Sequence, residues 1–204
     1  MNNALQPIEL NDQVRELQTI LRDATTTPSD FVFYADRLIR LVVEEALNLL
    51  PYRTCQIETC SGELYDGLRF KKGNCGVSLC RSGEAMEKGL RECCRSIRIG
   101  KLLIDYDPQS DEPRPLYSRL PLDICRRRVL LLYPIMSTGG TVVTALEEIT
   151  SKGCAAANVI VLTLFCTESS ANKVKERFAD VQILTTEVCK SVPSQFGKKD
   201  FGTD

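Results

Sequence analysis

The chain has 204 residues, a formal net charge of −1 at pH 7, ten cysteines and no histidine. Its length suits one α/β domain with a sizeable core, and its near-neutral charge gives no field that would favour nucleic acid or a membrane surface. The missing histidine excludes Ser-His-Asp and Cys-His nucleophilic machinery and the usual mixed zinc sites.

The first ten residues contain neither a basic lead nor an apolar core, and no apolar run approaches the roughly 18 residues of a membrane span. We therefore expect a cytosolic protein, with the nucleus as an alternative location. None of the cysteines forms a C-x-x-C pair, so we expect reduced thiols, several of them in the core, and no redox or metal role.

Two helices are predicted first. Asn11 or Asp12 caps one of them, and a second runs over about residues 31–50 until Pro51 stops it. The apolar stripe of the second helix is expected to be core or subunit interface. Its members are Tyr34, Leu38, Leu41, Val42, Ala46 and Leu49.

Weakly alternating segments at 52–59 and 64–70 flank Ser61-Gly62 and predict a hairpin. Apolar runs then predict strands near residues 76–80, 97–105, 129–133, 157–165 and 181–185. Between several of these strands, apolar residues recur at the spacing of a helix. This alternation favours a mostly parallel sheet flanked by helices, with right-handed crossovers. The segment 107–121 holds four prolines and is predicted to be a surface loop.

The strand at 129–133 passes almost directly into a helix over 141–151. In the connecting loop, Gly139 and Gly140 let the backbone turn tightly and approach a ligand. Ser137, Thr138 and Thr141 add hydroxyl groups beside the free N–H groups of the helix N-terminus. Such a loop favours a phosphate. The alternative is an ordinary strand-to-helix turn with a Ser/Thr cap, because neither the Walker nor the dinucleotide pattern is present.

A second strand-to-helix turn lies at residues 76–83 and carries Arg81. One turn with a cation and one with amides and hydroxyls together suit a ligand with two separated anionic groups. In sheets of this kind ligands bind beyond the carboxyl ends of the strands. Both turns are therefore expected to open into the same crevice.

The segments SLCRSGEAM and YPIMSTGGT resemble the two signature segments of uracil phosphoribosyltransferases, which read roughly I-L-R-A-G and V-D-P-M-L-A-T-G-G. The resemblance spans about residues 10–204 and is closest to the animal members. It implies a type I phosphoribosyltransferase-like fold with a β-hairpin arm. It also implies one domain over 1–204, with residues 1–10 flexible and 191–204 forming the tail that recognises the base.

The resemblance implies roles for particular residues. The 5′-phosphate of 5-phosphoribosyl 1-diphosphate, the donor, would sit in the loop of residues 137–141. Arg81 would serve the diphosphate side, with Mg²⁺ accompanying the donor and no protein metal site. Arg127 aligns with a phosphate-facing position, although a charge run is usually a solvated face. The nearest equivalents of the uracil-reading positions are Ser191, Phe196 and Gly197.

Some family members bind GTP as an activator near subunit interfaces, and the arm takes part in dimer contact. The resemblance therefore implies a homodimer or higher homo-oligomer and candidate GTP-binding residues, for which solvated surface charge is the alternative. These candidates are Arg37, Lys71, Lys72, Gly73, Asn74 and Arg98.

Three positions depart from the family pattern. Tyr133 stands where an acidic residue holds the ribose hydroxyls, Tyr106 stands where an arginine closes on diphosphate, and the loop at 194–200 is shortened. The resemblance implies the formation of UMP and diphosphate from uracil and 5-phosphoribosyl 1-diphosphate. The departures predict weak or lost catalysis, with a non-catalytic nucleotide-binding sensor or interaction protein as the alternative.

Overall fold

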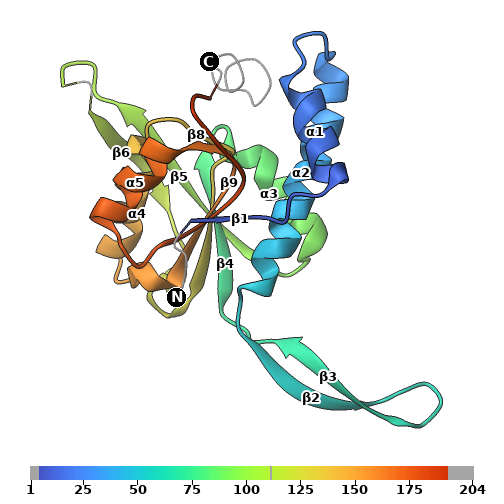
Figure 1. Cartoon of the computed structure of the whole chain (residues 1–204). Coiled ribbons are helices and arrows are strands. Elements are labelled where there is room, and N and C mark those ends of the chain that lie inside the picture. The colour runs from blue at the N-terminus through green and yellow to red at the C-terminus, as the bar shows by residue number, and fades with distance from the viewer. Residues whose placement is uncertain (1–4, 111, 193–204) are drawn as a thin grey trace.

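The parallel strands of this protein form one sheet with helices on both faces. A computed structural model describes residues 5–110 and 112–192 (Figure 1). The strand order is β1-β10-β9-β7-β4-β5-β6, with β8 also paired to β9; only β5 and β6 are antiparallel. The bounds are β1 Leu5–Pro7, β4 Asn74–Cys80, β5 Arg98–Tyr106, β6 Pro113–Arg119, β7 Arg128–Leu132, β8 Ile135–Met136, β9 Val159–Thr167 and β10 Gln182–Cys189. The predicted fold class is confirmed.

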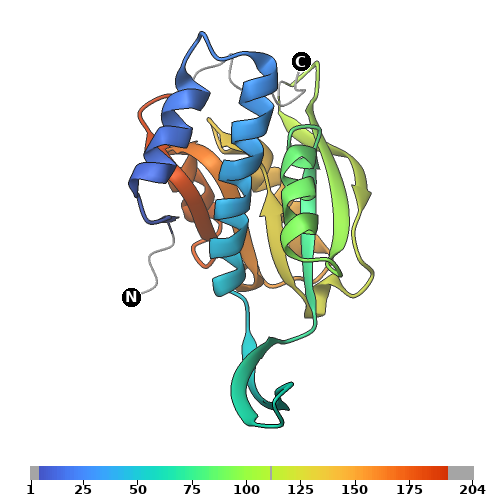
Figure 2. The same ribbon diagram turned by 90° about the vertical axis from the view of Figure 1, so that its right-hand side faces the viewer.

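Two groups of helices cover the sheet. The first group, facing the viewer in Figure 2, is α1 Asp12–Arg22, α2 Pro28–Asn48 and α3 Gly83–Cys93. The second group, on the other face, is α4 Gly140–Ser151 and α5 Glu168–Arg177. Short 3₁₀ helices at Ile124–Arg126 and Ala156–Asn158 precede β7 and β9.

The central strand β7 is apolar throughout because both of its faces are covered. Leu130 and Leu132 pack into the core under α1–α3, whereas Val129 and Leu131 pack into the core under α4 and α5. Successive side chains of a strand point to opposite faces, so an uninterrupted apolar run supplies both cores. This strand fixes the position of the loop that follows it.

The second helix differs from its prediction in its start and in its apolar face. It begins at Pro28, three residues earlier than expected, because the Thr27 side chain caps it by accepting a hydrogen bond from the Asp30 amide. Leu41 was predicted to be part of the apolar stripe but is 38% exposed, while Ile39 and Val43 are buried. The buried face of the helix is therefore shifted around its axis from the predicted apolar stripe.

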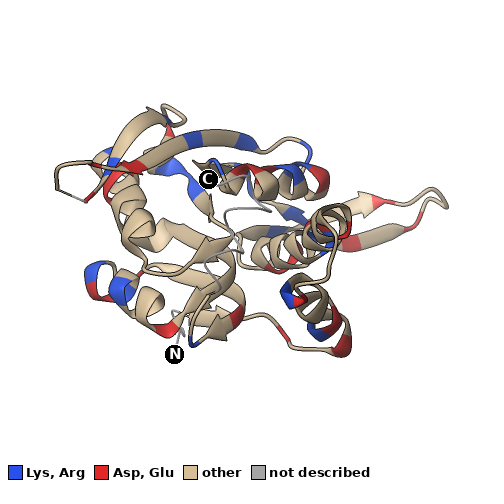
Figure 3. Cartoon of the chain, turned by 90° about the horizontal axis from the view of Figure 1, so that it is seen from above, with Lys and Arg blue, Asp and Glu red and all other residues tan. Residues whose placement is uncertain are grey.

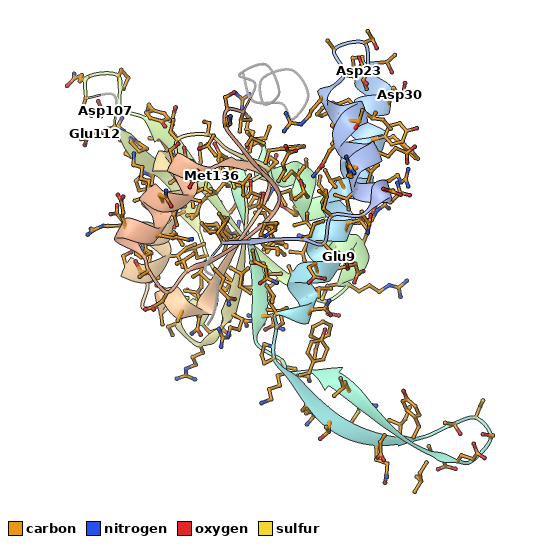
Figure 4. The ribbon with its side chains drawn as sticks, viewed as in Figure 1. Glu9, Asp23, Asp30, Asp107, Glu112 and Met136 are labelled. Carbon is orange, nitrogen blue, oxygen red and sulfur yellow. The ribbon has the colours of Figure 1, made fainter. Side chains whose placement is uncertain are left out.

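The predicted surface loop at 107–121 is wrong in its second half, which forms β6. This strand pairs antiparallel with β5 and lies at the edge of the sheet. An edge strand tolerates Pro113 and Pro115 because one of its sides makes no ladder hydrogen bonds. The second half of the predicted loop is thus anchored to the sheet, and Figure 4 labels Asp107 and Glu112 at the turn that precedes it.

The predicted hairpin is confirmed as an antiparallel pair, β2 Tyr52–Glu58 and β3 Leu64–Phe70. It projects away from the sheet as a separate arm (Figures 1 and 2). Leu64 and Leu68 on this arm are 71% and 67% exposed. Within the described residues, no helix is long and apolar enough to cross a membrane.

Close packing between α2 and α3 gives a test of the fold. A Cβ added to Gly89 would lie 2.5 Å from Cγ2 of Ile39, a buried residue of α2. We expect Gly89→Ala to lower the free energy of unfolding by about 1–3 kcal/mol through overpacking, measured by urea denaturation. In an Ile39→Ala background, Gly89→Ala should lower the free energy of unfolding by much less. An equal decrease in both backgrounds would contradict this packing.

Candidate functional site

The turns after β4 and β7 lie side by side. The two strands are parallel neighbours with Ser78 opposite Leu132, so their carboxyl ends lie at the same edge of the sheet. The start of α3 touches the end of β7, because a Cβ on Gly83 would lie 2.5 Å from the Leu132 carbonyl oxygen. The structure therefore brings the turn with Arg81 and the loop of residues 137–141 to one edge, as the sequence predicts.

The loop of residues 137–141 depends on a glycine at its tightest point. Gly139 has φ of 76° and is the N-cap of α4. A Cβ at this position would lie 2.7 Å from the backbone oxygen of Ser170 on α5. Both the left-handed backbone and the close approach of α5 exclude a side chain here. Ser137 and Thr138 are exposed, whereas Gly139 and Gly140 are buried.

Two hydroxyl groups from the start of α5 bind the carbonyls at the start of this loop. Thr167 donates a hydrogen bond of 2.7 Å to the Ser137 carbonyl. The Ser170 hydroxyl lies 2.9 Å from the Met136 carbonyl and 2.8 Å from the carbonyl of Thr167, and can donate its proton to either. Figure 4 labels Met136 at the upper end of the sheet. These contacts fix the loop on the α5 side.

The same two residues form a capping box. The Thr167 side chain accepts from the Ser170 amide at 3.0 Å, and the Ser170 side chain accepts from the Thr167 amide at 3.2 Å. Both residues are buried. Sequence reasoning missed their role, although a Thr at an N-cap with a polar side chain three residues later is a recognisable signal of a helix N-terminus.

The backbone amides of this loop remain available to a ligand. The N–H groups of residues 138–142 have no hydrogen-bond acceptor within the described part of the chain. The N-cap of α4 likewise makes no side-chain capping bond. A helix N-terminus in this state favours an anion through its free N–H groups and its dipole.

Two tyrosines lie against the same loop. Tyr133 follows β7 and is half-buried; desolvation raises the pKa of its phenol, and a hydrogen bond with Thr141 partly opposes that shift. The Tyr106 hydroxyl lies 3.7 Å from the position that a Cβ on Gly140 would take. Tyr133 therefore stays uncharged near neutral pH, and its phenol brings no negative charge to the place where it contacts the loop.

Arg81 lies exposed in the turn between β4 and α3. Nearby, Lys101 of β5 pairs with Glu84 in the first turn of α3, at 2.6 Å. Burial and the charge of Glu84 raise the pKa of the Cys80 thiol. The thiol beside Arg81 therefore stays protonated near neutral pH, and the guanidinium is the anion-binding group that this turn offers.

Arg127 does not lie in this crevice, contrary to the sequence prediction. It immediately precedes β7, whereas the loop follows the far end of that strand, roughly 17 Å away at the rise of a β-strand. Its guanidinium makes two bonds to the Asp123 carboxylate, at 2.7 and 2.6 Å, and one of 3.3 Å to the Asn74 carbonyl. Arg127 thus forms a structural ion pair at the amino end of the sheet.

Most candidate GTP-binding residues lie at that amino end. Lys71, Lys72 and Gly73 connect the arm to β4, which begins at Asn74, and Arg98 begins β5, 3.7 Å from Asp123.

The remaining candidate, Arg37, lies elsewhere. It is on α2 with its guanidinium 5.8 Å from the centre of the Tyr34 ring. Since it stands eleven residues before the end of α2 at Asn48, it lies roughly 16 Å along the helix from the arm. The structure does not bring Arg37 together with the other candidates within one chain.

Of the predicted uracil-reading positions, Ser191 is exposed just after β10, and Phe196 and Gly197 lie outside the described residues. Within the described ranges, no group of three or more Asp, Glu, Cys or His side chains could hold a metal ion. Acidic and basic residues are interspersed along the ribbon in the view of Figure 3. The arrangement suits an anionic ligand that spans the two turns.

The chain is similar to known proteins over most of its length. The family model for uracil phosphoribosyltransferase matches residues 8–197. The uracil phosphoribosyltransferase homolog of Danio rerio is 56% identical over 200 residues, which are 98% of this chain and 78% of that protein. The human homolog is 54% identical over 98% of this chain and 65% of its own length. Uracil phosphoribosyltransferase 1 of Schizosaccharomyces pombe is 42% identical over 94% of this chain and 89% of its own.

Solved structures share the fold at low sequence identity. The AQ2163 protein of Aquifex aeolicus gives a TM-score of 0.80 with 20% identity, covering 93% of this chain and 89% of that one. A purine phosphoribosyltransferase of Pyrococcus horikoshii gives a TM-score of 0.51 with 15% identity, covering 75% and 83%. At such identities the structures support the fold alone. On the family model and the relatives in sequence, the chain belongs to the uracil phosphoribosyltransferase family.

Proposed function

We propose that this chain binds 5-phosphoribosyl 1-diphosphate between the loop of residues 137–141 and Arg81, and transfers its phosphoribosyl group to uracil only slowly. The products of the transfer are UMP and diphosphate. The observation that carries the proposal is the loop itself, in which the N–H groups of residues 138–142 lack acceptors within the described chain while the preceding carbonyls are bonded. This is a phosphate-binding arrangement.

Donor binding needs groups for two anions. The loop offers amides and the Ser137 and Thr138 hydroxyls for the 5′-phosphate, and Arg81 offers a guanidinium for the diphosphate. Because no acidic metal cage is present among the described residues, we propose that Mg²⁺ enters with the diphosphate oxygens of the donor, which are the hard ligands that it prefers. Its role there is to neutralise charge on the leaving diphosphate.

Slow transfer follows from Tyr133. In the family pattern a carboxylate at this position holds the ribose hydroxyls. A hydrogen bond to a charged group contributes about 1.5–3 kcal/mol, so the loss of two such contacts removes roughly 3–6 kcal/mol. If these contacts tighten in the transition state, the rate falls by about two to four powers of ten. A neutral phenol replaces one contact at most and does not stabilise positive charge developing on the ribose.

The alternative function is a nucleotide-binding sensor or interaction protein without catalysis. The contact of Tyr133 with Thr141 and the position of the Tyr106 hydroxyl beside Gly140 favour it, because both phenols occupy space at the donor loop without adding charge. A sensor of 5-phosphoribosyl 1-diphosphate would share donor binding with the enzyme and lack turnover, whereas a GTP sensor or an interaction protein need not bind the donor.

Donor titration and uracil transfer test the proposal together. We expect calorimetry with 5-phosphoribosyl 1-diphosphate and Mg²⁺ to show micromolar binding that Arg81→Gln weakens by about tenfold to a hundredfold. Radiolabelled uracil should then appear slowly in UMP. Binding without any label in UMP would favour the sensor, and the absence of donor binding in the wild type would refute the proposed function.

Tyr133 gives a gain-of-function test. Tyr133→Asp should raise the rate of label transfer by about tenfold or more, because it restores a carboxylate that can hold the ribose hydroxyls. Tyr133→Phe serves as the control, since it removes the hydroxyl and adds no charge. Equal rates in the wild type and both variants would contradict the role assigned to this position. Circular dichroism verifies that each variant is folded.

The arm makes a homodimer or higher homo-oligomer the expected state. An isolated two-stranded hairpin is marginally stable in water, and Leu64 and Leu68 are exposed on this one. We propose that a second copy covers these side chains. Sedimentation equilibrium should show a dimer or larger species for the wild type and a shift toward monomer for Leu68→Asp; a wild-type monomer would refute the assembly.

A further inference from the structure

Helix α5 is fixed rigidly against the proposed phosphate loop. The Thr167 and Ser170 hydroxyls bond carbonyls at the start of the loop, and the Ser170 backbone lies against Gly139. Farther along the helix, Arg177 pairs with Glu147 of α4 at 3.0 Å. The start of α5 is therefore bonded to the loop, and its end has a surface ion pair with α4.

One lysine of α5 projects toward the start of α4. Lys173 stands three residues after Ser170, so the two lie on the same face of the helix. Its Nζ lies 3.8 Å from the position that a Cβ on Gly140, the first residue of α4, would take. The Tyr106 hydroxyl lies 3.7 Å from the same point. The ammonium group and the phenol thus lie beside the loop.

The Lys173 side chain is exposed, and within the described part of the chain no ion pair or hydrogen bond holds its ammonium group. The N-terminus of a helix carries a partial positive charge, which repels a cation. The positive end of α4, its free amides and the Lys173 ammonium group are therefore concentrated at one point, an arrangement that becomes favourable when an anion lies among them.

We propose that Lys173 binds the phosphate group held by the loop of residues 137–141. This inference rests on the proposed function and extends it, because it assigns a cation to the phosphate end of the site, to which the loop itself contributes amides and hydroxyls and from which Arg127 is distant. The ligand class is the phosphate of a sugar 5-phosphate. Arg81 then serves the diphosphate end, so the two cations contact different groups of one donor.

The test separates the two ends of the donor with two probes, ribose 5-phosphate and magnesium pyrophosphate. Their dissociation constants are measured by calorimetry for the wild type, Lys173→Gln, Lys173→Arg and Lys175→Gln. The last variant is the matched control, since it removes the same charge from the same helix two residues away, about 200° around its axis. Thermal unfolding verifies that the four proteins are equally stable.

We expect Lys173→Gln to weaken ribose 5-phosphate binding by about tenfold at low salt and to change pyrophosphate binding by less than about twofold. Lys173→Arg should restore most of the affinity for ribose 5-phosphate because it keeps the charge. Lys175→Gln should leave both constants within about twofold of the wild type.

Two results would overturn the inference while leaving the proposed function intact. In the first, Lys173→Gln binds ribose 5-phosphate as tightly as the wild type. In the second, Lys173→Gln and Lys175→Gln weaken it equally, which would reveal only the net charge of α5. If the wild type binds neither ribose 5-phosphate nor 5-phosphoribosyl 1-diphosphate, the proposed function and this inference both fail.

Discussion

The hydroxyl groups of Thr167 and Ser170 bind the carbonyls of Ser137 and Met136, and the geometry of the loop depends on these contacts. A carbonyl that is already bonded to α5 is not free to turn into the crevice. The amides that follow it are left without acceptors in the described chain. Gly139 is required by the same contact, since α5 approaches closer than a side chain would permit. Two helices and one strand end thus jointly build the proposed anion site.

Under the proposed function, the same loop explains why donor binding and turnover would separate. Phosphate binding needs amides, hydroxyls and nearby cations, all of which the crevice retains. Phosphoribosyl transfer also needs negative charge near the ribose, and Tyr133 offers a neutral phenol whose pKa is raised by burial. Ground-state binding of the phosphates would therefore persist while stabilisation of the transition state is reduced.

Local patterns in the sequence predicted the elements well where burial decides them. The apolar run at β7 and the pair of glycines after it indicated both the central strand and the loop. The edge strand β6 was missed because its prolines are typical of loops and only pairing with β5 shows that they are tolerated. Arg127 was misplaced because the family resemblance was followed there, although the residue stands before the apolar run at 129–133 and the loop stands after it.

The contribution of α5 could not be predicted for a different reason. Thr167, Ser170 and Lys173 are about thirty residues from the loop in sequence, and only the pairing of β7 and β8 with β9 brings them to it. A capping signal in the sequence identifies the start of a helix. It does not show which groups of another segment the capping hydroxyls also bind. Long-range contacts of this kind depend on topology and not on local pattern.

The most direct test of this account is to observe the backbone amides of the loop in solution. In ¹⁵N-labelled protein titrated with ribose 5-phosphate, the amide signals of residues 138–142 should shift most, and those of residues 71–74 at the amino end of the sheet should stay unchanged. Shifts confined to residues 71–74, or none in the loop at saturating ligand, would contradict the claim that this loop is a phosphate site.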